Sequence, residues 1–359
     1  MSARTATPAN DRYAALTEDI LDAVRQAGAG DEFILKSRVA AFEAAVVEAT
    51  GFAYAIACAG VQGGVSLALH ALGIGRGHEV VVPAFGDLGA VSAVALTGAV
   101  PVFADVDPER GTLAPGHAAA VTAHTRAVLA SPGDTALHEA VRRDGLPLIE
   151  VQHGWRPGAD RPASPPPNSV RVVSMGPEGV LGGIGDGAVL LTDDAETATA
   201  LRMLRNHGQD LRIRFYHPRV GFNCRMDESV AAFLVRRIAT TDMPAVAALA
   251  ERFRAGMSAA PGLVPVLGGH LAFGGFPIRL HRRDGARRRL ADLGLAVAPS
   301  RVLLLPAHPV FAGAGVRGRY PAAERFGREL LILPMHPQLA DETVDAMVTA
   351  LVRVMREPA

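Results

Sequence analysis

Ionisable side chains come shortly after several apolar runs of the sequence, where they could exchange protons with a bound ligand. His153 follows the run that ends at Val151, and Asp87 and Glu178 follow two other runs. An imidazole changes its charge near neutral pH, and a nearby carboxylate can hold or accept its proton. We therefore expect His153, Asp87 and Glu178 to be catalytic. Each of them could equally be an ordinary hydrogen-bonded or solvated loop residue.

Other polar and aromatic residues of the same loops could bind a substrate. Trp155 is the only tryptophan of the chain, and its flat ring could stack on a sugar or a base. Gln152 lies in the same short cluster, and Asp186 precedes another apolar run. We predict that Gln152, Trp155 and Asp186 contribute to the substrate site.

Short runs rich in Val, Ile and Leu alternate with helical patterns along most of the chain. Such runs are typical of strands that are buried on both faces, as parallel strands are. The alternation predicts an α/β fold, with a mostly parallel, doubly wound sheet and a smaller C-terminal α/β domain. We place a mobile tail at 1–12, a large domain at 13–243 and a small domain at 244–359. The expected strands are 54–59, 79–83, 100–103, 126–130, 147–151, 170–175 and 188–192, and the expected helices between them are 62–72, 88–96, 135–143 and 195–205.

The composition is that of a globular protein and argues against several kinds of partner. The formal net charge is zero, with 36 basic and 36 acidic residues, so neither nucleic acid nor an anionic membrane is expected to bind. Cys58 and Cys224 are the only cysteines, which gives no disulfide framework and no metal-binding spacing. The first dozen residues lack the apolar core of a signal peptide. We expect a cytoplasmic protein that binds a small-molecule substrate and no metal.

Six motifs follow one another between Ile34 and the C-terminus. They are VAAFE at 39–43, LHALGIGRGHEVVVP at 69–83, TGAVPVFADVD at 97–107, LRNHGQ at 204–209, GFNCRM at 221–226 and LPMHPQL at 333–339. In these motifs and their order the chain resembles the DegT/DnrJ/EryC1/StrS family of sugar aminotransferases. The resemblance implies the fold type I aminotransferase architecture and a cofactor, pyridoxal phosphate (PLP), bound at the carboxyl ends of the sheet strands.

The chain departs from this family at the residues that hold the cofactor. Its only lysine is Lys36, and a gapless comparison puts Gly179 where the family has the lysine that forms a Schiff base with PLP. Val151 stands in place of the acid that keeps the pyridine nitrogen protonated, and Asp87 in place of the aromatic residue that stacks on the ring. The usual phosphate turn reads AGVQ at 59–62. We therefore predict that no PLP or other cofactor is used, whereas an ordinary transaminase would have to employ Lys36.

Several other family positions are retained. Ser174 matches a residue that contacts the cofactor phosphate, and Asn223 matches the asparagine that reaches the partner's cofactor phosphate. His207 lies in a retained motif, and Tyr216 lies in the loop before Asn223 that borders the substrate in the family. We predict that these four residues bind substrate, although such residues also fix the backbone of turns. The retained motifs imply a homodimer, or a heterodimer with an active aminotransferase.

Two functions follow from this pattern. The first is a PLP-independent enzyme on an aminotransferase scaffold, which would act on a sugar, a nucleotide sugar or an aminocyclitol intermediate of secondary metabolism such as antibiotic biosynthesis. In this hypothesis the vacated cofactor volume holds the substrate. The alternative is a non-catalytic partner subunit of a true aminotransferase. That function would explain why residues that reach across the interface are kept while those of the chain's own site are lost.

Overall fold

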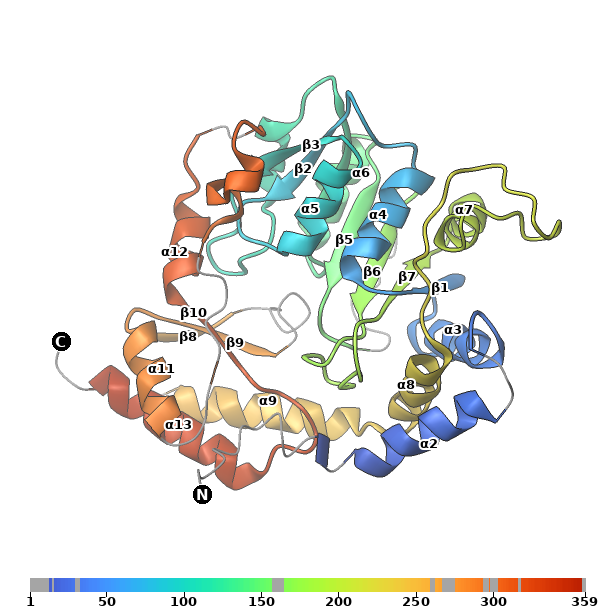
Figure 1. Cartoon of the computed structure of the whole chain (residues 1–359). Helices are drawn as coiled ribbons and strands as arrows, with labels where there is room; N and C mark the ends of the chain where they lie inside the picture. The colour runs from blue at the N-terminus through green and yellow to red at the C-terminus, as the bar shows by residue number, and fades with distance from the viewer. Residues whose placement is uncertain are drawn as a thin grey trace.

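The structure is a computed structural model that describes residues 13–14, 16–29, 33–156, 165–258, 262–266, 275–292, 297, 303–315 and 318–356. The predicted tail at 1–12 lies outside the described residues. Figure 1 shows a large sheet with helices on both faces, and beside it a smaller sheet with helices of its own. This arrangement confirms the predicted α/β fold.

The large sheet has seven strands in the part of the chain that the structure describes, in the order β1-β7-β6-β5-β4-β2-β3. Six strands run in one direction, and β7 is antiparallel to both of its neighbours. The strand residues are mostly buried, because helices cover both faces of the sheet. The strands are β1 (Tyr54–Cys58), β2 (Glu79–Pro83), β3 (Val100–Ala104), β4 (Thr125–Ala130), β5 (Leu148–Gln152), β6 (Val170–Ser174) and β7 (Ala188–Thr192).

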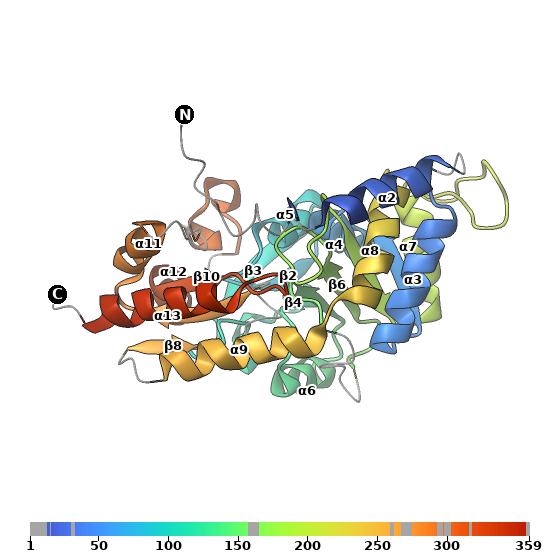
Figure 2. The same ribbon diagram turned by 90° about the horizontal axis from the view of Figure 1, so that it is seen from below.

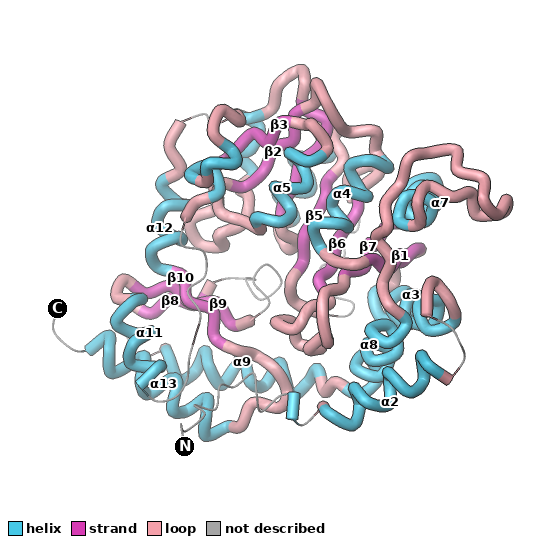
Figure 3. Tube along the Cα trace, in the orientation of Figure 1, coloured by secondary structure: helices cyan, strands magenta, loops and turns pink. Residues whose placement is uncertain are grey.

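Two groups of helices enclose this sheet (Figure 3). One group packs its apolar side chains in a single cluster with the central strands; it consists of α4 (Val61–Ala71), α5 (Leu88–Leu96) and α7 (Ala195–Arg205). The other group packs against β1, β6 and β7 from the opposite side; it consists of α2 (Thr17–Gly28), α3 (Ser37–Thr50) and α8 (Glu228–Thr240). Helix α6 (Thr135–Arg143) and the 3₁₀ turn η1 (Pro115–Ala120) cover a third cluster beside β4.

The smaller sheet is antiparallel, in the order β10-β9-β8. Its strands β8 (Leu263–Pro265), β9 (Phe276–Leu280) and β10 (Leu330–Leu333) share a core with α9 (Met243–Met257), α11 (Arg283–Asp292) and α13 (Asp341–Arg356). Figure 2 shows α9 and α13 lying alongside each other beneath this sheet. The predicted domain division at residue 244 falls at the start of α9. Helix α12 (Pro321–Glu329) and the short turns η2 (Leu305–Ala307) and η3 (Pro309–Phe311) pack against the core of the large sheet.

Aspartate side chains fix the start of several helices. Asp87, Asp134, Asp194 and Asp242 each accept a hydrogen bond from the backbone N–H three residues later, at 2.6 to 3.1 Å. Such caps satisfy backbone donors that the first turn of a helix leaves without a partner. Helix α4 differs, because it begins at Gly60, which has no side chain to cap it. Within the described residues, no helix has the length and apolar character needed to cross a membrane.

Candidate active site

A small cleft opens where β2, β4 and β5 end. Parallel strands bring their carboxyl ends to one edge of a sheet, and ligands of open α/β sheets bind there. The cleft therefore lies where the sequence predicted a site. Its lining residues are Pro83, Phe85, Gly86, Asp87, Gly111, Leu129, Ala130, Ser131, Val151 and His153.

His153 and Asp87 face each other in this cleft. The Nε2 atom of His153 lies 3.3 Å from Oδ2 of Asp87, and the two side chains are 21% and 23% exposed. The other carboxylate oxygen of Asp87 accepts the N–H of Ala90 at 2.6 Å, so the carboxylate is held by the start of α5. Nε2 of His153 is buried and makes no aligned hydrogen bond with a described residue. The imidazole thus has a nitrogen that can take or give a proton, beside a carboxylate that can stabilise its charged form.

Residue 179 lies against the backbone of His153. Gly179 is half-buried, and a Cβ atom built on it would lie 3.3 Å from the carbonyl oxygen of His153. A side chain at this position would therefore start next to the loop that carries His153. Glu178 is exposed and is not part of the cleft lining. The structure thus brings together His153 and Asp87, but not Glu178, from the predicted catalytic set.

Gln152 and Trp155, which were predicted to bind substrate, do not line this cleft. Successive strand residues point to opposite faces, so Gln152 leaves β5 on the face away from His153. Its side-chain amide donates to the carbonyl of Gly154 at 2.6 Å. Trp155 is 4% exposed and packs in the cluster that includes Val173. Its ring is therefore covered by core side chains and is not a free wall for a sugar.

Ser174 and Asp186 lie along the edge of the sheet beside β7. Ser174 ends β6, and its hydroxyl accepts the N–H of Gly176 at 3.4 Å. Asp186 is exposed, and its Cβ lies 3.8 Å from a Cβ built on Gly60, where the uncapped helix α4 begins. An uncapped helix start offers backbone N–H groups to an anion such as phosphate. Ser174 and Asp186 do not line the cleft. A substrate bound by Asp186 would lie near the start of α4.

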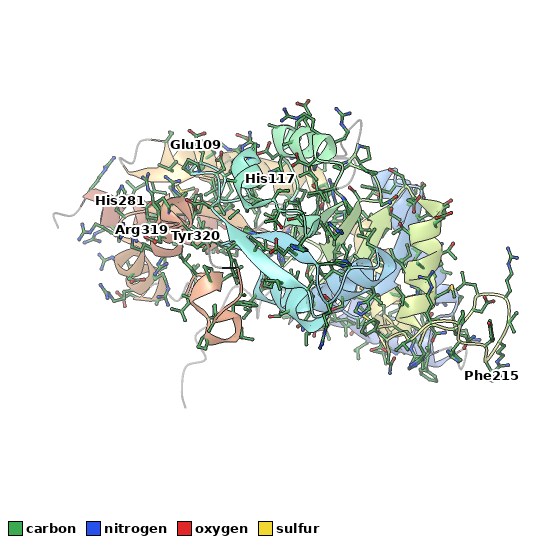
Figure 4. All side chains as sticks on the ribbon, turned by 90° about the horizontal axis from the view of Figure 1, so that it is seen from above. Glu109, His117, Phe215, His281, Arg319 and Tyr320 are labelled. Atoms are coloured by element: carbon green, nitrogen blue, oxygen red, sulfur yellow. The ribbon has the colours of Figure 1, made fainter. Side chains whose placement is uncertain are left out.

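The residues of the predicted interface loop lie away from the cleft. Asn223 pairs with Asn206 in an isolated β-bridge, and His207 adopts a left-handed backbone with φ at 59°. Both Asn223 and His207 are exposed, and Tyr216 is 54% exposed. Figure 4 shows Phe215 at one extreme of the molecule, far from His281. Within one chain, none of the three predicted loop residues lines the cleft.

Ser131 is a cleft residue that the sequence-based selection missed. It follows β4 directly, at the same edge as Asp87 and His153, and it is half-buried. A polar residue immediately after an expected strand was the available signal. No cluster of metal-ligating side chains occurs among the described residues.

The chain belongs to the DegT/DnrJ/EryC1/StrS aminotransferase family, whose model matches residues 14–140 and 167–352. It is 33% identical to the dTDP-3-amino-3,4,6-trideoxy-alpha-D-glucose transaminase of Streptomyces venezuelae, over 94% of this chain and 94% of that protein. It is 32% identical to the UDP-N-acetyl-3-dehydro-alpha-D-glucosamine 3-aminotransferase of Acidithiobacillus ferrooxidans, over 99% and 100% of the two chains. The crystal structure of S. venezuelae DesV in complex with a ketimine intermediate superposes with a TM-score of 0.87, at 29% identity and 98% coverage of both chains.

Family membership contradicts the prediction that no cofactor is used. The relatives named above are transaminases, and another neighbour of the same fold, NtdA from Bacillus subtilis, holds the cofactor PMP. The family therefore points to PLP as the cofactor of this scaffold. The departures at Gly179 and Val151 do not change the family to which the chain belongs. They concern how the family's cofactor would be attached and how its pyridine nitrogen would be protonated.

The side chains of the cleft nevertheless do not fit a lysine-bound cofactor. Gly179 has no amine, and Val151 has no carboxylate. Lys36 is the only lysine of the sequence. It is exposed just before α3, its backbone N–H donates to Glu228 at 2.6 Å, and it does not line the cleft. The chemistry of the cleft is therefore that of its own side chains, with His153 and Asp87 as the ionisable groups of its lining.

Proposed function

We propose that the protein is an enzyme that acts on a nucleotide-linked sugar, with His153 as the acid or base and Asp87 as its charge partner. The contact between His153 and Asp87, at the carboxyl ends of the strands and beside Gly179, carries this proposal. The names of the two relatives add support for the substrate class, since one acts on a dTDP-linked sugar and the other on a UDP-linked sugar.

The geometry favours proton transfer at Nε2 of His153. This atom makes no aligned hydrogen bond with a described residue, so the fold does not commit its lone pair or proton, and it could exchange a proton with a substrate hydroxyl, amine or acidic C–H. When the imidazole gains the proton, the carboxylate of Asp87 at 3.3 Å stabilises the resulting charge. Asp87 is itself held by Ala90, so it cannot swing away from His153 without losing the start of α5. Ser131 adds a hydroxyl on the same lining.

The proposal is tested by incubating the purified protein with dTDP-linked and UDP-linked keto-hexoses and amino-hexoses. Each mixture is made with and without added PLP and an amino donor, and products are detected by mass spectrometry. Binding of each sugar nucleotide is measured by calorimetry. Turnover that is lost in His153→Asn supports the proposal. A protein that binds none of these sugar nucleotides, or that turns them over equally well in His153→Asn, contradicts it.

A second candidate function is that of a partner subunit, and one observation favours it. The loop between α7 and α8 projects from the body of the molecule (Figures 1 and 3). Large apolar side chains lie exposed along it, an unusual feature for a surface loop without a partner. Asn223, near the end of this loop, is exposed as well. The exposed apolar residues of the loop are Leu211, Ile213, Phe215, Tyr216 and Val220.

The interface is tested by measuring the molecular mass in solution, alone and mixed with a lysine-bearing aminotransferase of the same family. We expect a homodimer that dissociates in Phe215→Ser, because the side chain of Phe215 is 76% exposed in the single chain. Leu96→Ser is the matched control, since Leu96 is 71% exposed but lies at the end of α5. A dimer that forms only with the second aminotransferase, and activity that requires it, would establish the partner-subunit function.

A further inference from the structure

The two cysteines of the chain lie together, although 166 positions separate Cys58 from Cys224 in the sequence. Cys58 is the last residue of β1 and is fully buried, and Cys224 is 7% exposed. The two thiols share a hydrogen bond. The pair lies outside the cleft lining, and nothing in the proposed reaction uses it.

Glycines at the start of α4 make room for both sulfur atoms. A Cβ atom built on Gly63 would lie 2.5 Å from Sγ of Cys224, and one built on Gly64 would lie 3.3 Å from Sγ of Cys58. The sulfurs therefore rest on two successive residues of one helical turn. The backbone N–H of Cys224 also donates to the carbonyl of Arg205 at 3.0 Å, which fixes the segment that carries this cysteine.

The surroundings make the two thiols chemically unequal. The hydrogen bond from Cys58 lowers the pKa of Cys224 to about 7 against the opposing effect of burial, and the charge of Arg205 lowers it further. The same hydrogen bond, together with burial, raises the pKa of the Cys58 thiol well above its usual value. Cys224 is therefore the more readily ionised of the two thiols, and the thiolate is the form that reacts with oxidants.

We propose that Cys58 and Cys224 are a redox-sensitive pair that closes to a disulfide when the protein meets a peroxide. In the first step the Cys224 thiolate attacks one peroxide oxygen, which gives a sulfenic acid and, after proton uptake, one water. In the second step the sulfur of Cys58 attacks the sulfenic sulfur, the S–S bond forms, and a second water leaves. Overall the two thiols lose two electrons and two protons, and hydrogen peroxide is reduced to two waters.

The disulfide would join covalently two segments that are far apart in the sequence. Cys58 leads directly into the turn at 59–62 where α4 begins, and Cys224 follows Asn223 at the end of the projecting loop. Oxidation would thus link the end of the projecting loop, at Cys224, to the end of β1, at Cys58, directly before the candidate phosphate-binding turn. The formation of this bond does not depend on the proposed function of the cleft.

The test uses the full chain, reduced and then exposed to hydrogen peroxide. We expect one peptide pair, containing Cys58 and Cys224, that is about 2 Da lighter than the two reduced peptides together and that a thiol reductant separates. The oxidised protein should run as a single chain on a non-reducing gel. Its thermal midpoint should rise by a few degrees, because the bond closes a long loop of the unfolded chain.

Three variants make the result specific. Cys58→Ser should trap the sulfenic acid on Cys224, whereas Cys224→Ser should leave Cys58 slow to oxidise. Gly63→Ala keeps both thiols but displaces the Cys224 sulfur, so disulfide formation should slow by about tenfold or more. The proposal is overturned if peroxide converts Cys224 to sulfinic acid without any linkage to Cys58. It is equally overturned if the linkage joins two different chains.

Discussion

Two histidine–carboxylate pairs lie beside β5, one on each side of the sheet, and they differ in how completely they are bonded. On one face, Glu150 lies 2.7 Å from Nε2 of His138, accepts a hydrogen bond from Nε of Arg171 at 2.9 Å and pairs with Nη2 of Arg171 at 2.8 Å. On the other face, His153 lies 3.3 Å from Asp87 in an open cleft. The first three side chains are at most 8% exposed, and the second pair is more than 20% exposed.

The difference separates a structural network from a chemical one. Burial raises the pKa of Glu150, but the charges and hydrogen bonds of Arg171 and His138 outweigh it and hold that pKa below its usual value. The carboxylate therefore stays charged and is fully engaged by the fold. Nε2 of His153 makes no aligned hydrogen bond with a described residue, so this pair is less completely bonded than the first. An ion pair that is saturated stabilises one conformation, whereas an unsaturated pair can act on a substrate.

The largest expected effect comes from placing an amine at residue 179, next to the loop that carries His153. Gly179→Lys should form one covalent adduct per chain with added PLP, after borohydride reduction and peptide mapping by mass spectrometry. The backbone of Gly179 is not left-handed, and its Cβ would need only a small shift of the His153 carbonyl at 3.3 Å. Glu178→Lys is the matched control, because residue 178 is exposed and outside the cleft. Equal labelling of the two variants would show that the cleft does not hold the cofactor.

The next effect concerns the rate of the reaction. His153→Asn should lower the turnover number by about 10²- to 10⁴-fold, the usual cost of losing an acid or base, with little change in the thermal midpoint. His138→Asn is the matched control on the other face of β5, and it should lower stability without a comparable loss of rate. If both variants lose stability and neither loses rate, His153 has a structural role like that of His138, and the proposed catalytic role of His153 is wrong.

Changes in the buried network of Glu150, His138 and Arg171 should alter stability and not activity. Glu150→Gln removes the carboxylate charge that pairs with the buried Arg171 and His138, so the free energy of unfolding should fall by about 3–5 kcal/mol in urea titrations. Activity per folded molecule should stay near that of the parent protein. A loss of activity without a loss of stability would assign Glu150 to the reaction instead of the fold.

The same network sets a dependence on pH. Because the pKa of Glu150 is lower in the folded protein, its contribution to stability is complete above the ordinary carboxyl pKa of 4.5 and is lost as the pH falls through the folded value. Glu150→Gln should remove this part of the acid sensitivity. The comparison is made by measuring the free energy of unfolding of both proteins between pH 7 and pH 3.

The sequence predicted more of the fold than of the site. Strands that are buried on both faces have continuous apolar sequences, which makes them easy to predict. The expected and observed bounds of β2 and β7 therefore coincide, at 79–83 and 188–192. The reversed direction of β7 leaves no such trace, because an antiparallel strand buried on both faces has the same apolar pattern.

The site was harder because it depends on which face each side chain leaves. His153 and Asp87 were expected in the cleft and do meet there. Gln152 and Trp155 were expected beside them, but the alternation along β5 and the packing of the indole carry both to the opposite side. A run of polar residues after a strand predicts the edge of the sheet at which they lie. It does not predict the face of the sheet to which each side chain points.

The smallest effect separates the two roles of Asp87, which caps α5 and faces His153. Asp87→Ala should lower the free energy of unfolding by about 1 kcal/mol, because the N–H of Ala90 loses its partner. Asp87→Ser should restore most of this stability, since serine also caps helices, yet it removes the carboxylate that supports His153. Asp242→Ala deletes the equivalent cap of α9, far from the cleft, and should cost similar stability without lowering the rate. If Asp87→Ser is as active as the parent protein, Asp87 serves the helix alone and His153 works without a charge partner.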